Sequence, residues 1–192
     1  MARNKAYTVK YRRKRNSQTD YKYRLRLLKS RKPRLVIRKF LNNTTAQIIE
    51  YNGKGDEIVA SAYSKELRNY GWKAGISSLP SAYLLGLLIG KKALSKKINF
   101  CIADIGLNPS VKGSLIYAVL KGALDAGLEI PHNEKILPDD KRICGNHIEE
   151  YAKRIKKTEI YQKQFSSYIK NNVNPEDITK EFEKIKAKIL EK

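Results

Sequence analysis

The side chains with the clearest potential for chemistry are His132, Cys144 and His147. These residue types bind zinc, and the spacing from Cys144 to His147 is typical of a ligand pair. A tetrahedral site needs a fourth ligand, which is missing unless Cys101 or a carboxylate supplies it. Neither histidine has a nucleophile and an acid in an arrangement known for nucleophilic catalysis. We therefore predict no metal ion and no catalytic residue, and interpret these side chains as contact residues.

The run from Gly86 to Lys92 has a superficial likeness to a phosphate-binding loop. That loop needs four residues between its glycines and a serine or threonine after its lysine. Here three residues separate Gly86 from Gly90, and Lys92 follows Lys91 inside a segment with helical spacing. We predict that the two glycines let a helix pack closely on a neighbour, and that the protein has no cofactor and no small-molecule substrate.

A metal-dependent nuclease is an alternative, because some of these enzymes begin with a three-stranded meander followed by a helix and a strand. They need inward-facing carboxylates to hold divalent cations. The first predicted strand, RLVIRKF, contains no acid, and Asp104 alone stands at the end of the fourth. We therefore predict that the protein is not an enzyme.

Positive charge is concentrated at the N-terminus. Residues 1–39 hold sixteen Lys and Arg and one acid, Asp20, which gives +15 of the net +21 of the chain. Each cation placed against a phosphate releases a condensed counterion, so the segment indicates a polyanionic partner. Four tyrosines, which can stack on unpaired bases, are interleaved with the charges: Tyr7, Tyr11, Tyr21 and Tyr23. The pattern favours nucleic-acid binding over a solubilising or targeting tail.

The elements that must position these cations begin with an arm and a short helix. Residues 1–18 lack an apolar period and are dense in charge, so we expect a disordered arm in the isolated protein. From Thr19 onward, apolar residues recur at helical spacing, with Thr19 as a plausible N-cap. Pro33 ends this basic helix.

The middle of the chain predicts an α/β domain with a mixed sheet. Runs rich in Ile, Val and Tyr predict strands at residues 34–41, 46–51 and 57–63, and Asn52-Gly-Lys-Gly55 predicts a hairpin between the last two. The first three strands therefore form an antiparallel meander. The remaining predicted elements are a short helix at 64–70, an apolar helix starting near Pro80, a strand at 98–103 and a helix at 114–126 capped by Gly127.

The chain after Ile130 is a turn-rich segment followed by two predicted polar helices. The last helix opens at Asn174 and Pro175 and carries one apolar stripe, formed by Ile178, Phe182, Ile185 and Ile189. We predict that this stripe contacts protein, either the domain itself or a neighbour, rather than RNA. The chain thus divides into a basic arm with its helix (1–30), an α/β core (31–130) and a helical extension (131–192).

The expected compartment is the cytoplasm. Cys101 and Cys144 are too few and too far apart for a disulfide framework, so we interpret both as reduced thiols. The basic N-terminus is not followed by an apolar run, so no secretory signal is expected. The longest nearly apolar run, residues 82–90, is half of the roughly twenty residues that a membrane span needs and belongs in a core.

Four phrases resemble a known family: QTDYKYRLRLLKSRKPRLVIRK, PSAYLLGLLIGKKA, ADIGL and KGALDAGLEIPHNEKILPDDKRICGNHIEEY. The chain is similar over about residues 10–151 to the large-subunit ribosomal protein eighteen family in its archaeal form, the counterpart of the eukaryotic large-subunit protein five. The resemblance implies a ribonuclease H-like fold without the catalytic acids. It also implies that the protein binds 5S rRNA and attaches it in the central protuberance, beside large-subunit rRNA and neighbouring ribosomal proteins.

By the matching phrases, one group of RNA-binding residues lies in the arm, the helix and the first strand: Arg12, Arg13, Arg15, Tyr21, Arg24, Arg26, Lys29, Arg31, Lys32 and Arg34. Further candidates are Asn108 and Lys112 in one loop, and His132, Asn133, Arg142 and His147 in the turn-rich segment. A DNA-binding module or another RNA-binding module is the main alternative, and the nuclease is the second.

Overall fold

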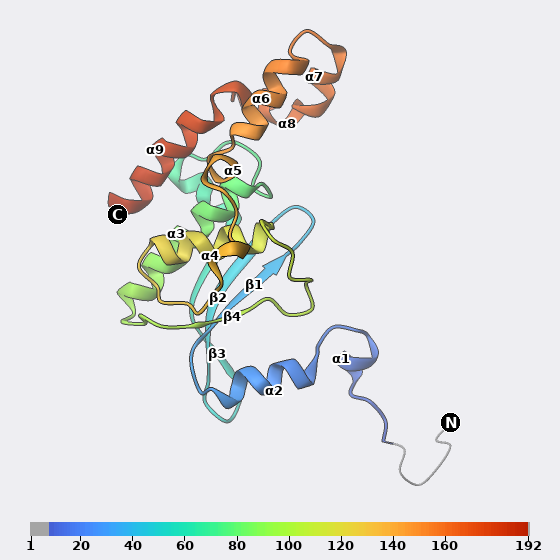
Figure 1. Cartoon of the computed structure of the whole chain (residues 1–192), viewed down its shortest axis with the longest axis vertical. Helices are drawn as coiled ribbons and strands as arrows, with labels where there is room; N and C mark the ends of the chain where they lie inside the picture. The colour runs from blue at the N-terminus through green and yellow to red at the C-terminus, as the bar shows by residue number, and fades with distance from the viewer. Residues whose placement is uncertain (1–7, 192) are drawn as a thin grey trace.

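A four-stranded mixed sheet organises the computed structural model, which describes residues 8–191 (Figure 1). The strand order is β3-β2-β1-β4, in which β1, β2 and β3 run antiparallel and β4 runs parallel to β1. The strands are β1 (Arg34–Lys39), β2 (Thr44–Tyr51), β3 (Asp56–Tyr63) and β4 (Ile102–Asp104). The predicted α/β class, the meander and the mixed sheet are confirmed.

Local backbone chemistry explains both the hairpin and the length of β4. The Asn52 side chain accepts hydrogen bonds from the amides of Lys54 and Gly55, as the predicted turn requires. The fourth strand begins later than predicted, because Phe100 bridges to Glu129 instead of pairing with β1. Only residues 102–104 therefore extend the sheet.

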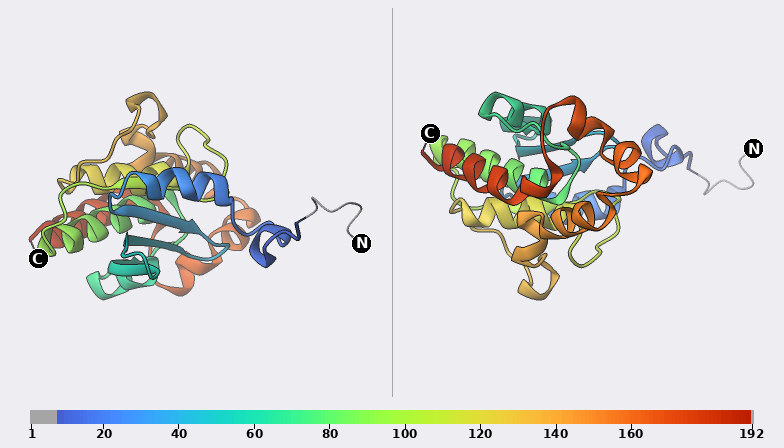
Figure 2. Two further views of the ribbon diagram at one scale, coloured as in Figure 1. Left: turned by 90° about the horizontal axis from the view of Figure 1, so that it is seen from below. Right: turned by 90° about the horizontal axis from the view of Figure 1, so that it is seen from above.

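Two helices pack on one face of the sheet and on each other. Helix α3 (Leu79–Ser95) lies against β2 and β3, and α4 (Leu115–Asp125) lies against β1 (Figure 2). A Cβ atom added at Gly86 or at Gly122 would lie 2.1 Å from a backbone carbonyl oxygen of the other helix. This confirms that Gly86 serves close packing. The run 82–90 is buried throughout, as predicted, and in residues 8–191 no helix is long and apolar enough to cross a membrane.

The C-terminal third contains more helices than the two predicted. Gly145, at φ +93°, separates two helices within the segment interpreted as turns. An added Cβ there would lie 3.2 Å from Ile178 and Pro80, so the position favours glycine. Phe165 is buried among tyrosine rings and separates two further short helices. The helices are α5 (Asp140–Cys144), α6 (Asn146–Ile155), α7 (Glu159–Gln164), α8 (Ser166–Lys170) and α9 (Ile178–Glu191).

Helix α9 places its apolar stripe inside the protein's own core. Ile178, Phe182, Ile185 and Ile189 are each at most 2% exposed and belong to the same cluster as the sheet residues. The Phe182 ring packs 5.5 Å from that of Tyr83 on α3. The stripe was predicted to contact either the domain itself or a neighbouring protein. The structure shows that it packs on the domain itself.

Three short 3-10 helices complete the described elements. They are η1 (Ser64–Tyr70), η2 (Glu134–Ile136) and η3 (Pro175–Asp177). Helix η1 confirms the short helix predicted at residues 64–70, and η3 confirms the predicted start of the last helix at Asn174 and Pro175.

Candidate nucleic-acid interface

The basic N-terminal segment forms two helices rather than one. Residues 1–7 of the predicted disordered arm lie outside the described residues, but α1 (Arg12–Arg15) forms a helical turn where none was predicted. The turn is held towards α2 (Tyr21–Lys29) because the Arg13 Nε donates a hydrogen bond to the Thr19 hydroxyl at 2.9 Å. The ring centroids of Tyr11 and Tyr21 also lie 5.1 Å apart.

Asp20, not Thr19, caps helix α2. The Asp20 carboxylate accepts hydrogen bonds from the amides of Lys22 at 2.9 Å and Tyr23 at 3.1 Å. A carboxylate in this position satisfies amides that lack helical partners and opposes the positive end of the helix dipole. The one acid of the basic segment therefore serves to start the helix that presents the cations.

An alternating chain of charges fixes α2 to the sheet. Arg24 on α2 pairs with Asp56 at the start of β3 at 2.9 Å, and Arg34 on β1 pairs with the same carboxylate at 2.8 Å. Arg34 also pairs with Asp104 at the end of β4 at 3.0 Å, and Arg38 pairs with Asp104 at 3.3 Å. Each of the two aspartates thus binds two guanidinium groups, and α2 is oriented by three strands.

Arg34 does not belong to the RNA-contacting set. Its side chain is 2% exposed and both of its terminal nitrogens are paired with carboxylates, so it cannot reach a phosphate. The prediction of direct contact is therefore wrong for this residue, whose role is to hold Asp56 and Asp104 in place. Asp104, the candidate carboxylate of the nuclease alternative, is bound to arginines and to the Gly106 amide.

A cavity of about 850 Å³ opens between α2 and the loop after β4. We call it the α2 cavity. Four predicted contact residues line it together, although they come from distant parts of the chain: Arg13, Tyr21, Arg24 and Asn108. Two further lining residues, Tyr23 and Arg38, were not among the predicted contacts. Burial, followed by the charge of Asp104, raises the pKa of Tyr23, so its hydroxyl remains protonated and able to donate.

Arg38 is held rigidly at the wall of the α2 cavity. One of its terminal nitrogens donates hydrogen bonds to the carbonyl oxygens of Ile37 at 2.9 Å and Asp104 at 3.1 Å. A Cβ added at Gly106 would lie 3.0 Å from that nitrogen, so the guanidinium group lies against this glycine. The alternation of strand residues places Arg38 on the same face as Arg34, which is the sequence signal that identifies it.

The remaining predicted cations of this segment lie on the outer surface. None of the following forms an ion pair within residues 8–191, and all are exposed: Arg12, Arg15, Arg26, Lys29, Arg31 and Lys32. The Lys32 ammonium lies 5.4 Å from the centroid of the Phe100 ring. Lys112 is exposed in the loop that contains Asn108. These cations are available to an external polyanion because no carboxylate of the described chain neutralises them.

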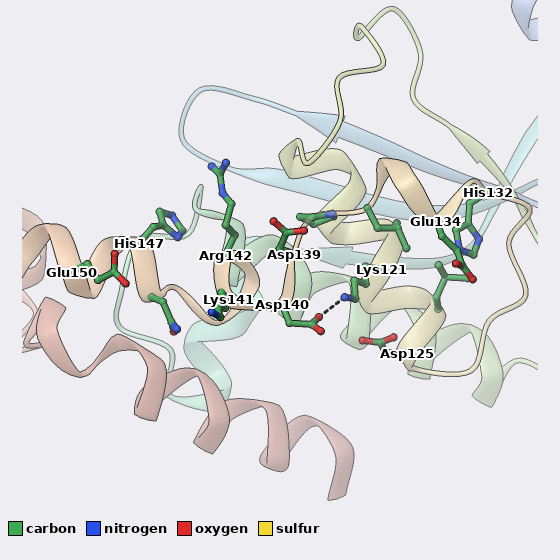
Figure 3. A pocket seen from close by; sticks show the side chains of 14 residues that line it. Lys121, Asp125, His132, Glu134, Asp139, Asp140, Lys141, Arg142, His147 and Glu150 are labelled. Atoms are coloured by element: carbon green, nitrogen blue, oxygen red, sulfur yellow. Dashed lines mark hydrogen bonds and ion pairs between the residues drawn. The ribbon is translucent and has the colours of Figure 1, made fainter.

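A second cavity, of about 1040 Å³, lies beside α4, α5 and the start of α6 (Figure 3). We call it the α5 cavity. Three predicted contact residues line it: His132, Arg142 and His147. Asn133 is not among the lining residues, and its side chain caps η2 by accepting from the Lys135 amide at 3.0 Å. The structure thus brings most of this predicted group to one place.

The α5 cavity has an acidic lining. Its formal charge is −2 with neutral histidines, from Asp125, Glu134, Asp139, Asp140 and Glu150 against Lys121, Lys141 and Arg142. Lys121 pairs with Asp140, and the Tyr83 hydroxyl donates to Asp125 at 2.6 Å. The other three carboxylates form no side-chain hydrogen bond or ion pair within the described chain. Arg142 and His147 project to one side of the chain and Lys141 to the other (Figure 3).

His132 and His147 both line the α5 cavity, but their immediate surroundings differ. One ring nitrogen of His132 lies 2.7 Å from the carbonyl oxygen of Ile130. Burial, followed by the positive charge of Arg142, lowers the pKa of His147. Cys101 and Cys144 are free thiols, and burial raises the pKa of Cys101 to about 12. Across residues 8–191, no three His, Cys, Asp or Glu side chains are grouped so as to hold a metal ion.

Comparison with known proteins adds two findings. The profile of a family described as "Ribosomal large subunit proteins 60S L5, and 50S L18" matches residues 5–100 and 95–133. The large ribosomal subunit protein uL18 of Methanococcus maripaludis is 49% identical to this chain over 191 residues, which cover 99% of each sequence.

Proposed function

This chain belongs to the family of ribosomal large-subunit proteins that includes 60S L5 and 50S L18, and from that premise we propose that it binds 5S rRNA and attaches it in the central protuberance. Family membership makes the protein a structural constituent of the large ribosomal subunit, in the cytoplasm, with rRNA and ribosomal proteins as its partners. We propose the finer points: that the bound RNA is 5S rRNA, and that the protein lies in the central protuberance.

The observation that carries the proposal is the anchored basic surface of α1 and α2. Its outward cations have no carboxylate partners in the described chain, whereas the acids nearby are bound to Arg24, Arg34 and Arg38. Rigidly held charges lose less conformational entropy on binding than charges on a free arm. The surface is therefore suited to a large polyanion of fixed shape.

RNA is the polyanion that suits this surface best. The major groove of an RNA helix is too deep and narrow for side chains to read, so proteins recognise its backbone shape and address unpaired bases by stacking. The outer cations would follow the phosphates, while Tyr21 and Tyr23 would meet unpaired bases. In this proposal RNA is bound by residues 1–30 together with Arg31, Lys32, Asn108 and Lys112. The rest of residues 31–130 forms the scaffold, and residues 131–192 stabilise it and contact protein.

A competition experiment tests the choice of nucleic acid. Labelled 5S rRNA bound to the full chain is challenged with unlabelled 5S rRNA, an unrelated RNA and duplex DNA at equal nucleotide concentration. We expect that only 5S rRNA competes efficiently. Efficient displacement by duplex DNA would contradict the proposal and favour a DNA-binding module. Incubation of the labelled RNA with Mg²⁺ in the same series should leave it intact, since the proposed role is placement rather than reaction.

The position in the subunit is tested by sedimentation. The protein should co-sediment with large subunits and should be released together with 5S rRNA when that RNA is extracted. Release of the protein while 5S rRNA stays bound would show that other contacts hold it in the particle.

A further inference from the structure

We infer that the α2 cavity holds one unpaired nucleotide of the bound RNA, with its base inside the cavity and its phosphate at the rim. The inference rests on the proposed function, because the RNA supplies the nucleotide. It goes further by assigning a base-binding site to a cavity that joins residues of α2, β1 and the loop after β4.

The charges inside the cavity favour an uncharged ligand group. Asp56 and Asp104 line it, and both are already bound to arginines on two sides. A phosphate placed in the interior would approach these two carboxylates. A base carries no charge and avoids this repulsion, and its edges can use the polar groups that remain.

Flat side chains form the walls of the cavity. Tyr21 is half-buried, and its ring is supported from outside by that of Tyr11 at 5.1 Å. Tyr23 also lines the cavity, and burial raises the pKa of its hydroxyl, which therefore stays neutral. Aromatic rings on a rigid helix give a stacking surface at low entropic cost, which is how proteins hold unpaired bases.

Arg38 supplies a second planar group. Its guanidinium is fixed in orientation by the Ile37 and Asp104 carbonyl oxygens and lies against Gly106, yet the side chain is 38% exposed. A guanidinium plane held in this way can stack on a base without losing further freedom. Asn108 lies at the same site, and its amide nitrogen is held by the Ile105 carbonyl oxygen at 2.8 Å.

The rim supplies positive charge for the phosphate. Arg13 lines the cavity and uses its Nε to bind Thr19, which orients its terminal nitrogens. Arg12 and Arg15 stand beside it on α1 and are exposed. The uncharged base would thus lie in the interior of the cavity, and the phosphate would lie among the cations at the rim.

Two variants test stacking without changing charge. Tyr21→Ala removes the ring, and Arg38→Lys keeps the charge but removes the plane. Stacking on one base is worth about 5- to 150-fold in affinity. We expect each variant to weaken binding of 5S rRNA within that range, with an unchanged slope of log affinity against log salt. Tyr21→Phe should recover most of the loss caused by Tyr21→Ala, because the ring returns.

The matched control is Arg26→Gln, an exposed cation on the same helix. It should lower the salt slope by about one, as expected for a lost phosphate contact. In parallel, unpaired adenosines of 5S rRNA are replaced one at a time by fluorescent 2-aminopurine. Wild-type protein should quench one position, and Tyr21→Ala should abolish that quenching.

The outcomes separate this inference from the proposed function. If wild-type protein fails to bind 5S rRNA, the proposed function fails. If wild-type binds tightly while Tyr21→Ala and Arg38→Lys bind equally well, the base site is wrong and the proposed function stands. A reduced salt slope in Tyr21→Ala would likewise refute stacking. Circular dichroism spectra of the variants ensure that a loss of affinity is not a loss of fold.

Discussion

The α2 cavity and the α5 cavity are both lined by predicted RNA contacts, but they use their acids in opposite ways. Around α2, Asp20 binds helix amides, while Asp56 and Asp104 each bind two arginines. At the α5 cavity, Glu134, Asp139 and Glu150 have no such partners in the described chain. The role of an acid near a basic surface therefore depends on its hydrogen bonds and ion pairs. A carboxylate paired with arginines orients these cations, whereas an unpaired carboxylate repels phosphate.

Salt gives the largest effect that can test this difference. With roughly six to ten phosphate contacts, the affinity for 5S rRNA should fall by about three to five decades between 50 and 200 mM salt. Filter binding across that range measures it. A flat response would contradict the electrostatic account of the basic surface.

The two cavities can be compared within the same salt series. Replacing Arg12 and Arg15 with glutamine should reduce the slope by about one for each lost contact. Replacing Lys141 and Arg142 with glutamine removes the same charge from the α5 cavity. Although the matching phrases predict an RNA contact at Arg142, the acidic lining should keep phosphate away, so we expect an unchanged slope. Equal changes in the two double variants would show that the α5 cavity also binds phosphate.

Arg34→Ala should give a large loss of stability. It leaves Asp104 buried with one fewer partner, and breaking a buried pair in this way costs about 3–5 kcal/mol in the free energy of unfolding. Urea denaturation followed by circular dichroism measures it, with the exposed Arg26→Ala as the matched control. Equal stabilities of the two variants would mean that Arg34 does not organise the site.

Phe182→Ala should separate fold from binding. Its ring is buried between α9 and Tyr83, so its loss should cost about 3–5 kcal/mol of stability. Below the unfolding transition, affinity for isolated 5S rRNA should remain that of wild-type, because α9 lies away from α2 (Figure 1). Reduced RNA affinity in a folded Phe182 variant would place an RNA contact on α9.

Asp20→Ala and Glu134→Gln each make the protein one charge more positive, but they should act in opposite directions. Loss of the α2 cap costs about 0.5–2 kcal/mol and loosens the cations, so Asp20→Ala should weaken RNA binding despite the added charge. Glu134→Gln removes a repulsive group and should leave binding equal or slightly stronger. Binding constants at one fixed salt concentration make the comparison, and stronger binding by Asp20→Ala would contradict the positioning role.

The smallest expected effect concerns His147. Its pKa lies below the ordinary value of 6.5, so the unfolded chain takes up more protons as the pH falls. The free energy of unfolding should therefore be greatest above pH 6.5 and should decrease slightly as the pH falls through the lowered pKa of His147. An NMR titration of the imidazole should show the lowered pKa, and Arg142→Gln should raise it by removing a nearby positive charge.

Much of the fold follows from local patterns. Asn52 and Gly53 mark the hairpin, Pro80 marks the start of α3 and the apolar spacing of Ile178 to Ile189 marks a buried face, because each depends on neighbouring residues alone. Two features differ from the prediction. Phe100 pairs with Glu129, almost thirty residues away, instead of with the predicted sheet, and helices lie on either side of Gly145 in a segment interpreted as turns. Both depend on tertiary contacts that no local window contains.

The site was predictable only in part for a similar reason. The cations of α1 and α2 were evident from composition, since most are exposed and need no partner. The burial of Arg34 and the contribution of Arg38 depend on Asp104, which lies 70 and 66 residues further along the chain. A run of like charges therefore identifies a binding segment but cannot show which members bind and which support.

The ion-pair chain also sets the order in which the interface can be completed during synthesis. Arg24 and Arg34 emerge early, but Asp56 lies 32 residues after Arg24 and Asp104 lies 70 residues after Arg34. At about 5–20 residues per second, the second carboxylate is made about 4–14 seconds after the arginine that it binds. The nascent basic segment is thus present before its anchor, and it acquires a fixed orientation only when the sheet has formed around β4. We therefore expect shape-specific RNA binding only after the core has folded around β4.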